Sequence, residues 1–166
     1  MPSRTAWPME RNRWIVVGID FSDGSLRALE YAMRLAADID ARVACVYAYE
    51  DALDAPSQHD PSLELRQQIE EAISGCSWRV PEVRAEPIVR RGAPWDKLLN
   101  VATDLGAELI VVGADGQRGC SRDHFLGTVP IRLAAISSRP VVVVPAHPPL
   151  ARSRQPTHVE AKHRPD

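Results

Sequence analysis

A glycine-spaced loop near the C-terminus carries the residue types that most clearly suggest chemistry. It follows an apolar run with Gly113 and Gly116, and it ends with Gly127 and Thr128 ahead of a helical pattern. Glycines allow backbone N–H groups to approach an anion closely, and a helix N-terminus adds unpaired donors and a positive dipole. The loop is therefore suited to hold phosphate.

Other catalytic and ligand-binding motifs are absent from the sequence. The chain has no Gly-x4-Gly-Lys-Ser/Thr motif, and its only lysines are Lys97 and Lys162, which excludes a P-loop. The five histidines show no metal-ligand spacing, and no Ser/His/Asp set is evident. Because rapid phosphoryl transfer needs an electrostatic clamp, we expect no catalytic residues, no metal site, and a binding protein with very slow hydrolysis or none.

The composition is that of an ordinary globular protein. With 166 residues, 45% of them hydrophobic, the chain can form one domain with its own core. We expect this domain at residues 13–146, between a flexible N-terminal segment (1–12) and a disordered C-terminal tail (147–166) that is polar and broken by prolines. The net charge of −2 gives no overall attraction to nucleic acid or anionic lipid.

A cytoplasmic location is expected from three further features. The N-terminus has no apolar signal-peptide region, and no run of residues is long and apolar enough to span a membrane. The three cysteines are odd in number and lack a C-x-x-C pair, which favours reduced thiols.

The elements that must position the loop alternate between strand and helix. Apolar runs predict strands at residues 14–19, 42–49, 83–90, 109–112 and 140–145. Apolar residues at helical spacing predict helices that include residues 26–36, 65–73, 94–105 and 129–136. Regular alternation of this kind predicts a parallel sheet with right-handed crossovers.

Turn and cap residues mark several of these boundaries. Either Ser22 or Ser25 suits the N-cap of the first helix. Pro94 suits the first turn of the third helix, and Gly106 suits its C-terminal cap. Pro87 has no N–H to donate, so we expect the third strand at an edge of the sheet.

Segments at both ends of this pattern resemble the universal stress protein family. One is the opening from Val17 to Ala32, VGIDFSDGSLRALEYA, and the other is the closing region with Gly113, Gly127-Thr128 and SRPVVVVP at 138–145. The resemblance covers about residues 13–145. It implies a Rossmann-like three-layer α/β sandwich, similar to the adenine nucleotide alpha hydrolases. Its five-stranded parallel sheet would have the order 3-2-1-4-5, with helices on both faces.

The resemblance also implies ATP as the ligand, with Mg²⁺ where a cation accompanies it. In such a sheet, ligands bind where the strand order reverses, beyond the carboxyl ends of the first and fourth strands. The implied binding residues are Gly18, Ile19, Asp20, Val46, Val112, Gly113, Gly116, Arg118, Gly127, Thr128 and Val129. The first three would border adenine and ribose, Val46 the base edge, and the glycine loop the phosphates, with Arg118 near the last of them.

Two features of the loop depart from the family pattern, Gly-x2-Gly-x9-Gly-Ser/Thr. Ten residues separate Gly116 from Gly127, where the pattern has nine. Asp115 stands where a basic or imidazole side chain is common. A carboxylate close to a polyphosphate costs up to roughly a few kcal/mol unless a divalent cation lies between them.

Several of these residues also have a purely structural explanation. Asp20 could cap the first helix through its side chain, and Thr128 could be the N-cap of the last helix with or without a ligand. The loop glycines could serve only as turns. Val46 is a core residue on almost any fold, and Arg118 could be a solvated loop charge.

We therefore expect a regulatory or stress-response protein that binds ATP. One alternative is a relative of the same fold that no longer takes nucleotide, and another is a slow adenine-nucleotide hydrolase. DNA binding through the C-terminal tail has the least support, because the tail's charges are few and mixed.

We also expect a homodimer. In the implied order the fifth strand, with Val141–Val144, is a sheet edge, and a bare apolar edge promotes aggregation unless it is covered. Pairing of this strand with its copy would cover it, with two-fold symmetry as the default. No membrane or nucleic-acid partner is expected.

Overall fold

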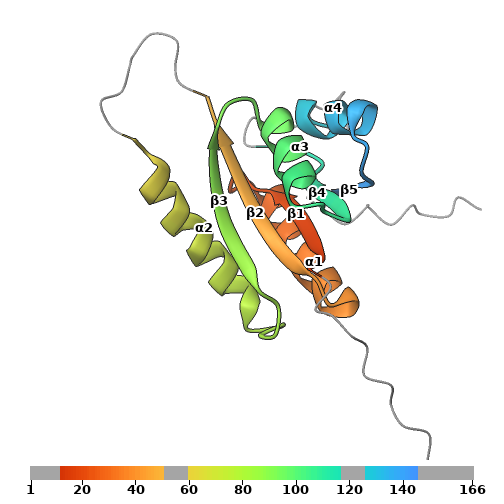
Figure 1. Cartoon of the computed structure of the whole chain (residues 1–166). Helices are drawn as coiled ribbons and strands as arrows, with labels where there is room; N and C mark the ends of the chain where they lie inside the picture. Colours follow the sequence, from red (N-terminus) through yellow and green to blue (C-terminus); the bar gives the residue numbers. More distant parts are fainter. Residues whose placement is uncertain (1–11, 51–59, 117–125, 146–166) are drawn as a thin grey trace, which may run out of the picture.

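A computed structural model of the chain describes residues 12–50, 60–116 and 126–145. Within them, strands and helices alternate strictly (Figure 1). The strands are β1 (Trp14–Gly18), β2 (Arg42–Tyr49), β3 (Ala85–Arg91), β4 (Leu109–Gly113) and β5 (Val141–Val144). The helices are α1 (Asp23–Ile39), α2 (Ser62–Ser77), α3 (Pro94–Asp104) and α4 (Thr128–Ile136). The predicted tail at 147–166, most of the predicted N-terminal segment and Arg118 lie outside the described residues.

The five strands form one parallel sheet in the order β3-β2-β1-β4-β5, as predicted. β1 lies at the centre, where Val17 pairs with Cys45 of β2 on one side and Val111 of β4 on the other. The prediction that Pro87 places its strand at an edge is confirmed, because β3 pairs only with β2 in this sheet.

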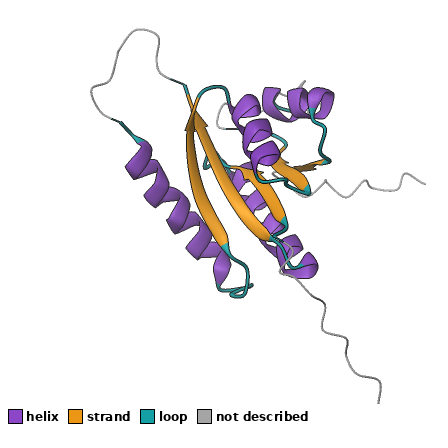
Figure 2. Cartoon of the chain, in the orientation of Figure 1, coloured by secondary structure: helices purple, strands orange, loops and turns teal. Residues whose placement is uncertain are grey.

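Helices cover both faces of the sheet (Figure 2). On one face, Leu29 and Met33 of α1 and Ile69 of α2 share a core with Ile15 and other strand residues. On the opposite face, α3 and α4 contribute a second core with the alternate residues of the strands. The three-layer α/β sandwich is therefore confirmed.

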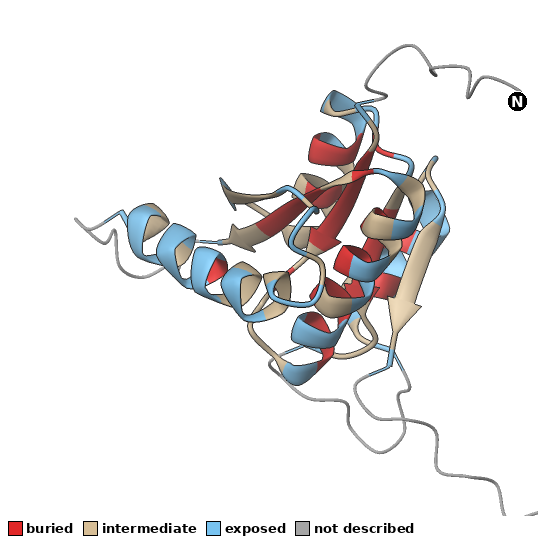
Figure 3. Ribbon diagram, turned by 90° about the horizontal axis from the view of Figure 1, so that it is seen from below, coloured by how far each residue is buried: buried red, intermediate tan, exposed pale blue. Residues whose placement is uncertain are grey.

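Burial is concentrated in the central strands and the inner faces of the helices that pack on them (Figure 3). α2 is the peripheral helix, because Ile69 is its single buried residue. Leu63 at its start and Trp78 just after its end are 79% and 71% exposed.

Most cap predictions are confirmed and one is wrong. Ser22 is the N-cap of α1, Pro94 begins α3, and Gly106 follows α3 with a left-handed φ of 60°. Thr128, however, is the first helical residue of α4, and its N-cap is Gly127 in an extended conformation. The reason is tertiary, since a hydrogen bond from Gly127 N to Ala114 O (2.6 Å) fixes the chain just before the helix.

The two cysteines in the described residues are both free thiols. Cys45 is buried in β2, and Cys76 is half-buried on α2. Burial raises the pKa of both thiols, so neither has the low-pKa environment of a reactive cysteine.

Candidate functional site

The candidate site lies at the carboxyl ends of β1 and β4. These strands are neighbours in the sheet, yet one connects to β2 on one side and the other to β5 on the opposite side. The strand order therefore reverses between them, which is where ligands bind in open parallel sheets. Asp20 follows β1 by two residues, and Gly113 is the last residue of β4.

Asp20 supports the cap of α1 rather than forming it. Its Oδ1 accepts hydrogen bonds from Ser22 N (3.0 Å) and Ser22 Oγ (2.5 Å), and Ser22 Oγ in turn accepts from Ser25 N (3.2 Å). The hypothesis that the side chain of Asp20 itself caps α1 is therefore wrong. Ser22 therefore holds the Asp20 carboxylate in place, and its Oγ also accepts the N–H of Ser25 in the first turn of α1.

The second oxygen of Asp20 lies against the glycine turn after β4. A Cβ placed on Gly116 would be only 2.7 Å from Asp20 Oδ2. The structure therefore brings together two residues that are 96 positions apart in the sequence and that were both predicted to bind the ligand. No other neighbour of Gly116 among the described residues lies closer to that position than the side chain of Asp20.

Two of the other predicted glycines have packing reasons of their own. A Cβ on Gly113 would lie 2.6 Å from the carbonyl carbon of Gly24, so β4 can approach the first turn of α1 only with glycine there. A Cβ on Gly18 would lie 3.0 Å from a methyl carbon of Leu98. These two glycines are thus explained by the fold, whereas the nearest atom to a Cβ on Gly116 is the end of a side chain, the Oδ2 atom of Asp20.

The N-terminus of α4 supplies unpaired backbone donors beside this turn. No side chain among the described residues caps α4, and its first turn contains no acidic residue. Pro130 has no N–H, so the donors of the first turn are those of Thr128 and Val129. An anion is stabilised at such an end by the donors and by the helix dipole.

The start of α1 differs from that of α4, although both helices begin at the same edge of the sheet. Ser22 caps α1 with its side chain, and Asp23 places a carboxylate in the first turn. α3 likewise carries Asp96 in its first turn. Of these three helix starts, only α4 lacks both a side-chain cap and an acidic residue in its own first turn.

Three predicted site residues have side chains in the core. Ile19, Val46 and Val112 are at most 4% exposed. Ile19 N also donates a hydrogen bond to Val46 O (2.9 Å), which ties the exit of β1 to β2. The core interpretation of Val46 is confirmed for its side chain, and any role of these residues toward a ligand would use their backbone.

An aromatic pair beside Asp20 was not found from the sequence. The rings of Phe21 and Tyr47 stack with centroids 5.2 Å apart. Phe21 has a left-handed φ of 63°, an uncommon conformation for a non-glycine residue and one that accumulates at functional sites. Burial raises the pKa of the Tyr47 phenol, and the negative charge of Asp20 raises it further. Tyr47 was predicted to lie in the strand at residues 42–49, but nothing in the sequence pairs it with Phe21.

Asp115 lies in the turn between Gly113 and Gly116. Its Oδ1 atom is buried and has no hydrogen-bond partner within the described residues. A Cβ on Gly127 would lie 3.8 Å from the Cα of Asp115, so this residue borders the start of α4. The departure from the family pattern that the sequence indicated therefore lies next to the donors of Thr128 and Val129.

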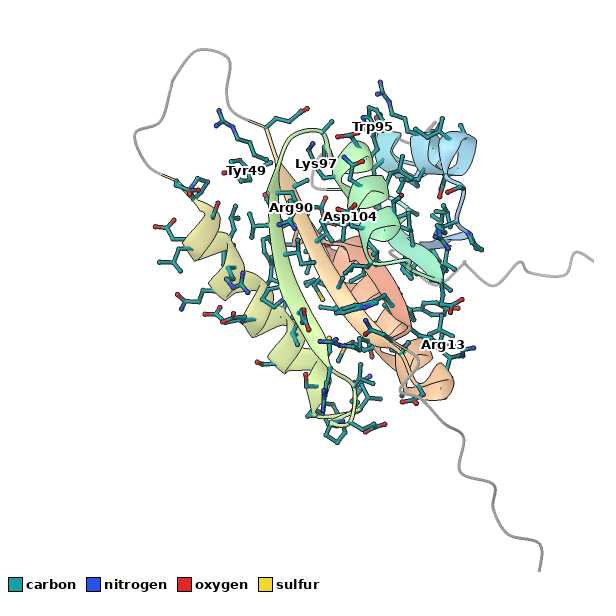
Figure 4. All side chains as sticks on the ribbon, in the orientation of Figure 1. Arg13, Tyr49, Arg90, Trp95, Lys97 and Asp104 are labelled. Atoms are coloured by element: carbon teal, nitrogen blue, oxygen red, sulfur yellow. The ribbon has the colours of Figure 1, made fainter. Side chains whose placement is uncertain are left out.

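Lys97 is the single lysine in the described residues, and it lies on another part of this edge of the sheet. Figure 4 shows Lys97 with Tyr49 and Trp95 near the carboxyl ends of β2 and β3, away from Arg13 at the opposite end. The Lys97 chain lies over Gly92, where a Cβ would be 2.4 Å from its Cε, and Lys97 Nζ pairs with Asp96 Oδ2 at 2.9 Å. Lys97 is therefore engaged on the α3 side of the sheet.

The described part of the chain contains neither a metal cluster nor a membrane-spanning helix. No group of three or more histidine, cysteine, aspartate or glutamate residues there could hold a metal ion. Within the same residues, the helices are too short or too polar to cross a membrane.

Comparison with known proteins identifies relatives along nearly all of the folded region. The model of the universal stress protein family matches residues 11–145. A universal stress protein of Mycobacterium tuberculosis is 32% identical over 144 residues, which cover 82% of this chain and 98% of the relative. A universal stress protein of Bacillus subtilis is 28% identical over 78% of this chain and 97% of the relative.

Solved structures agree with the fold. A universal stress protein in complex with cAMP is 28% identical, with a TM-score of 0.61 over 80% of this chain and 96% of the other. The universal stress protein UspA from Lactobacillus plantarum has a TM-score of 0.63 over 82% of this chain and 99% of the other, at 20% identity.

Proposed function

Because the chain belongs to the universal stress protein family, we propose that it binds an adenine nucleotide at the carboxyl ends of β1 and β4. The nucleotide would occupy the edge between Asp20, the turn at 113–116 and the start of α4. Nucleotide binding would act as a regulatory signal in a stress response, because it would change the surface that this protein presents to partner proteins.

The observation that carries this proposal is the uncapped start of α4 beside the glycine turn. The 2.6 Å hydrogen bond from Gly127 N to Ala114 O holds the helix start against the turn. The N–H groups of Thr128 and Val129 then have no side-chain partner among the described residues. A phosphate group supplies the negative charge and the acceptors that such an end binds well.

The adenine part of the ligand is supported by a relative. The 28% identical universal stress protein of similar fold was solved in complex with cAMP. ATP is the ligand implied by the sequence resemblance, and Mg²⁺ would enter with its phosphates. Two features of the described residues fit an adenylate. The N–H groups of Thr128 and Val129 can bind its phosphate, and Gly116 has no side chain that would enter the space beside Asp20.

We propose further that the protein is not an ATP-hydrolysing enzyme. Rapid phosphoryl transfer needs cations that stabilise the transition state and a positioned nucleophile. The single lysine in the described residues, Lys97, is paired with Asp96 at the α3 side of the edge. Asp115 adds a negative charge beside the turn instead of a positive one. Multiple turnover faster than about one per minute would contradict this proposal.

A homodimer through β5 and a location in the cytoplasm complete the proposed function. Ala114 N donates to Val144 O (2.8 Å), so the backbone polar groups of Val144 point toward β4. Because these groups alternate in direction along a strand, the N–H of Val143 points outward, away from β4. This outward edge is free to pair with a second copy of β5. The side chains of Val142 and Val143 instead pack on the two cores.

Isothermal titration of the purified chain with AMP, cAMP, ADP and ATP tests the binding proposal. Saturable binding of an adenine nucleotide, with no binding of the matching uridine nucleotide, is expected. The alternative that the fold has lost its ligand predicts no heat with any of them. Detection of AMP or other products after incubation with ATP would favour the hydrolase alternative.

A further inference from the structure

We infer that Asp115 makes the site selective for adenine nucleotides with a single phosphate group over the triphosphate. This inference rests on the proposed function and specifies its ligand. It comes from an acceptor with no partner: the buried Oδ1 atom of Asp115 makes no hydrogen bond within the described residues. Buried acceptors in proteins are nearly always hydrogen-bonded, and an exception calls for an explanation.

Asp115 stands at the point where a phosphate chain would extend. It lies in the turn between Gly113 and Gly116, and its Cα is 3.8 Å from where a Cβ on Gly127 would be. The hydrogen bond between Gly127 and Ala114 holds the start of α4 against the same turn. A phosphate bound by the first turn of α4 is therefore a near neighbour of the Asp115 side chain.

A second carboxylate borders the turn from the other side. Asp20 Oδ2 lies 2.7 Å from where a Cβ on Gly116 would be, and Asp20 Oδ1 is held in place by Ser22. The turn is thus flanked by two acidic side chains. Within the described residues, no lysine or arginine forms an ion pair with Asp115, so its charge is not offset there.

The charges of the site then favour one phosphate and oppose a chain of three. The donors and dipole of α4 attract the first phosphate group. Each further negative charge placed about 6 Å from a carboxylate, at an effective dielectric constant of about 40, is disfavoured by a factor of roughly ten in affinity. A ribose hydroxyl, by contrast, is uncharged. It can donate a hydrogen bond to the Oδ1 atom of Asp115, which has no partner within the described residues. Adenylates with a single phosphate suit both features.

Paired titrations of the full chain with AMP and ATP in EDTA test this inference. The unaltered protein should bind AMP more tightly than ATP. Asp115→Asn keeps the shape of the side chain and removes its charge, so it should raise the affinity for ATP about tenfold more than it raises that for AMP, which brings fewer negative charges to the turn. Asp104→Asn is the matched control, because Asp104 is exposed at the far end of α3 (Figure 4). It should change neither affinity.

Added Mg²⁺ provides a second measurement that needs no variant. By neutralising two phosphate charges, the cation should raise the affinity of the unaltered protein for ATP about tenfold and leave that for AMP nearly unchanged. This arm decides the question if Asp115→Asn fails to fold.

The outcomes separate this inference from the proposed function. If both proteins bind AMP and ATP with the same affinity ratio, or if Mg²⁺ does not favour ATP, Asp115 is not the selective residue and the proposed function stands. If neither protein binds any adenine nucleotide, the proposed function itself is wrong and the inference falls with it.

Discussion

Replacing glycines by alanine one at a time separates packing from binding at the candidate site. In Gly113→Ala, the added Cβ would lie 2.6 Å from the carbonyl carbon of Gly24 and 2.9 Å from Ser25 N. These are backbone atoms of α1, so the helix must move away from β4. Overpacking of this kind costs about 1–3 kcal/mol. In a domain of this size, a loss of about 2 kcal/mol lowers Tm by roughly 4–8 °C.

Gly116→Ala should behave differently, although the chemical change is the same. Its Cβ would meet Asp20 Oδ2 at 2.7 Å, and this atom is the end of a side chain and not part of the backbone. The free energy of unfolding should change by less than about 0.5 kcal/mol, because alanine also reduces the freedom of the unfolded chain. The displaced carboxylate should instead weaken AMP binding by roughly 3- to 10-fold.

Gly75→Ala is the matched control. Gly75 lies within α2, and a Cβ there has no neighbour within 4 Å among the described residues. Alanine should therefore raise the free energy of unfolding by about 0.5–1 kcal/mol through its helix preference, without any effect on AMP binding. Urea unfolding followed by circular dichroism, with AMP titration of each folded variant, measures both quantities. A Gly113→Ala protein as stable as the unaltered one, or a Gly116→Ala protein equally destabilised, would refute this reasoning.

Two further predictions concern stability and assembly. Glu30→Gln should reduce stability at about pH 7 but not at about pH 3. The hydrogen bond from Arg34 lowers the pKa of Glu30 more than burial raises it, and the charge of Arg79 lowers it further. A depressed pKa stabilises the fold fully above the ordinary pKa of glutamate, and this contribution disappears as the pH falls through the lowered value, so the urea midpoints of the two proteins should converge in acid. Val143→Pro removes the outward N–H of β5 and should convert the dimer to a monomer in light scattering, whereas Val143→Ala keeps that N–H and should remain dimeric. A Val143→Pro protein that is still dimeric would place the interface elsewhere.

The arrangement of strands and helices could be predicted because local and tertiary signals agree. β1 and β4 are uninterrupted apolar runs, and both are buried between two layers of helices. Pro87 restricted β3 to an edge without any knowledge of its neighbours. Ser22 was one of two candidate caps, and its position before the first apolar residue of α1 is where a cap belongs.

The details of the site depend on contacts that no short stretch of sequence contains. Gly127 replaces Thr128 as the N-cap of α4 because Ala114, on the far side of the loop, accepts its N–H. The stacking of Phe21 on Tyr47 joins a turn to a strand 26 residues later and requires a left-handed φ. The sequence singled out Asp115 for its charge, but the buried oxygen without a partner became visible only in the folded chain.

The most direct test of the central claim is a nitrogen-edited NMR titration of the isotopically labelled chain with AMP. If the donors at the start of α4 and the glycine turn hold the phosphate, the amide signals of Gly116, Thr128 and Val129 should shift together and saturate with one affinity. The amides of α2, such as Gly75, should not move. Saturation by AMP with the signals of Thr128 and Val129 unchanged would contradict the account.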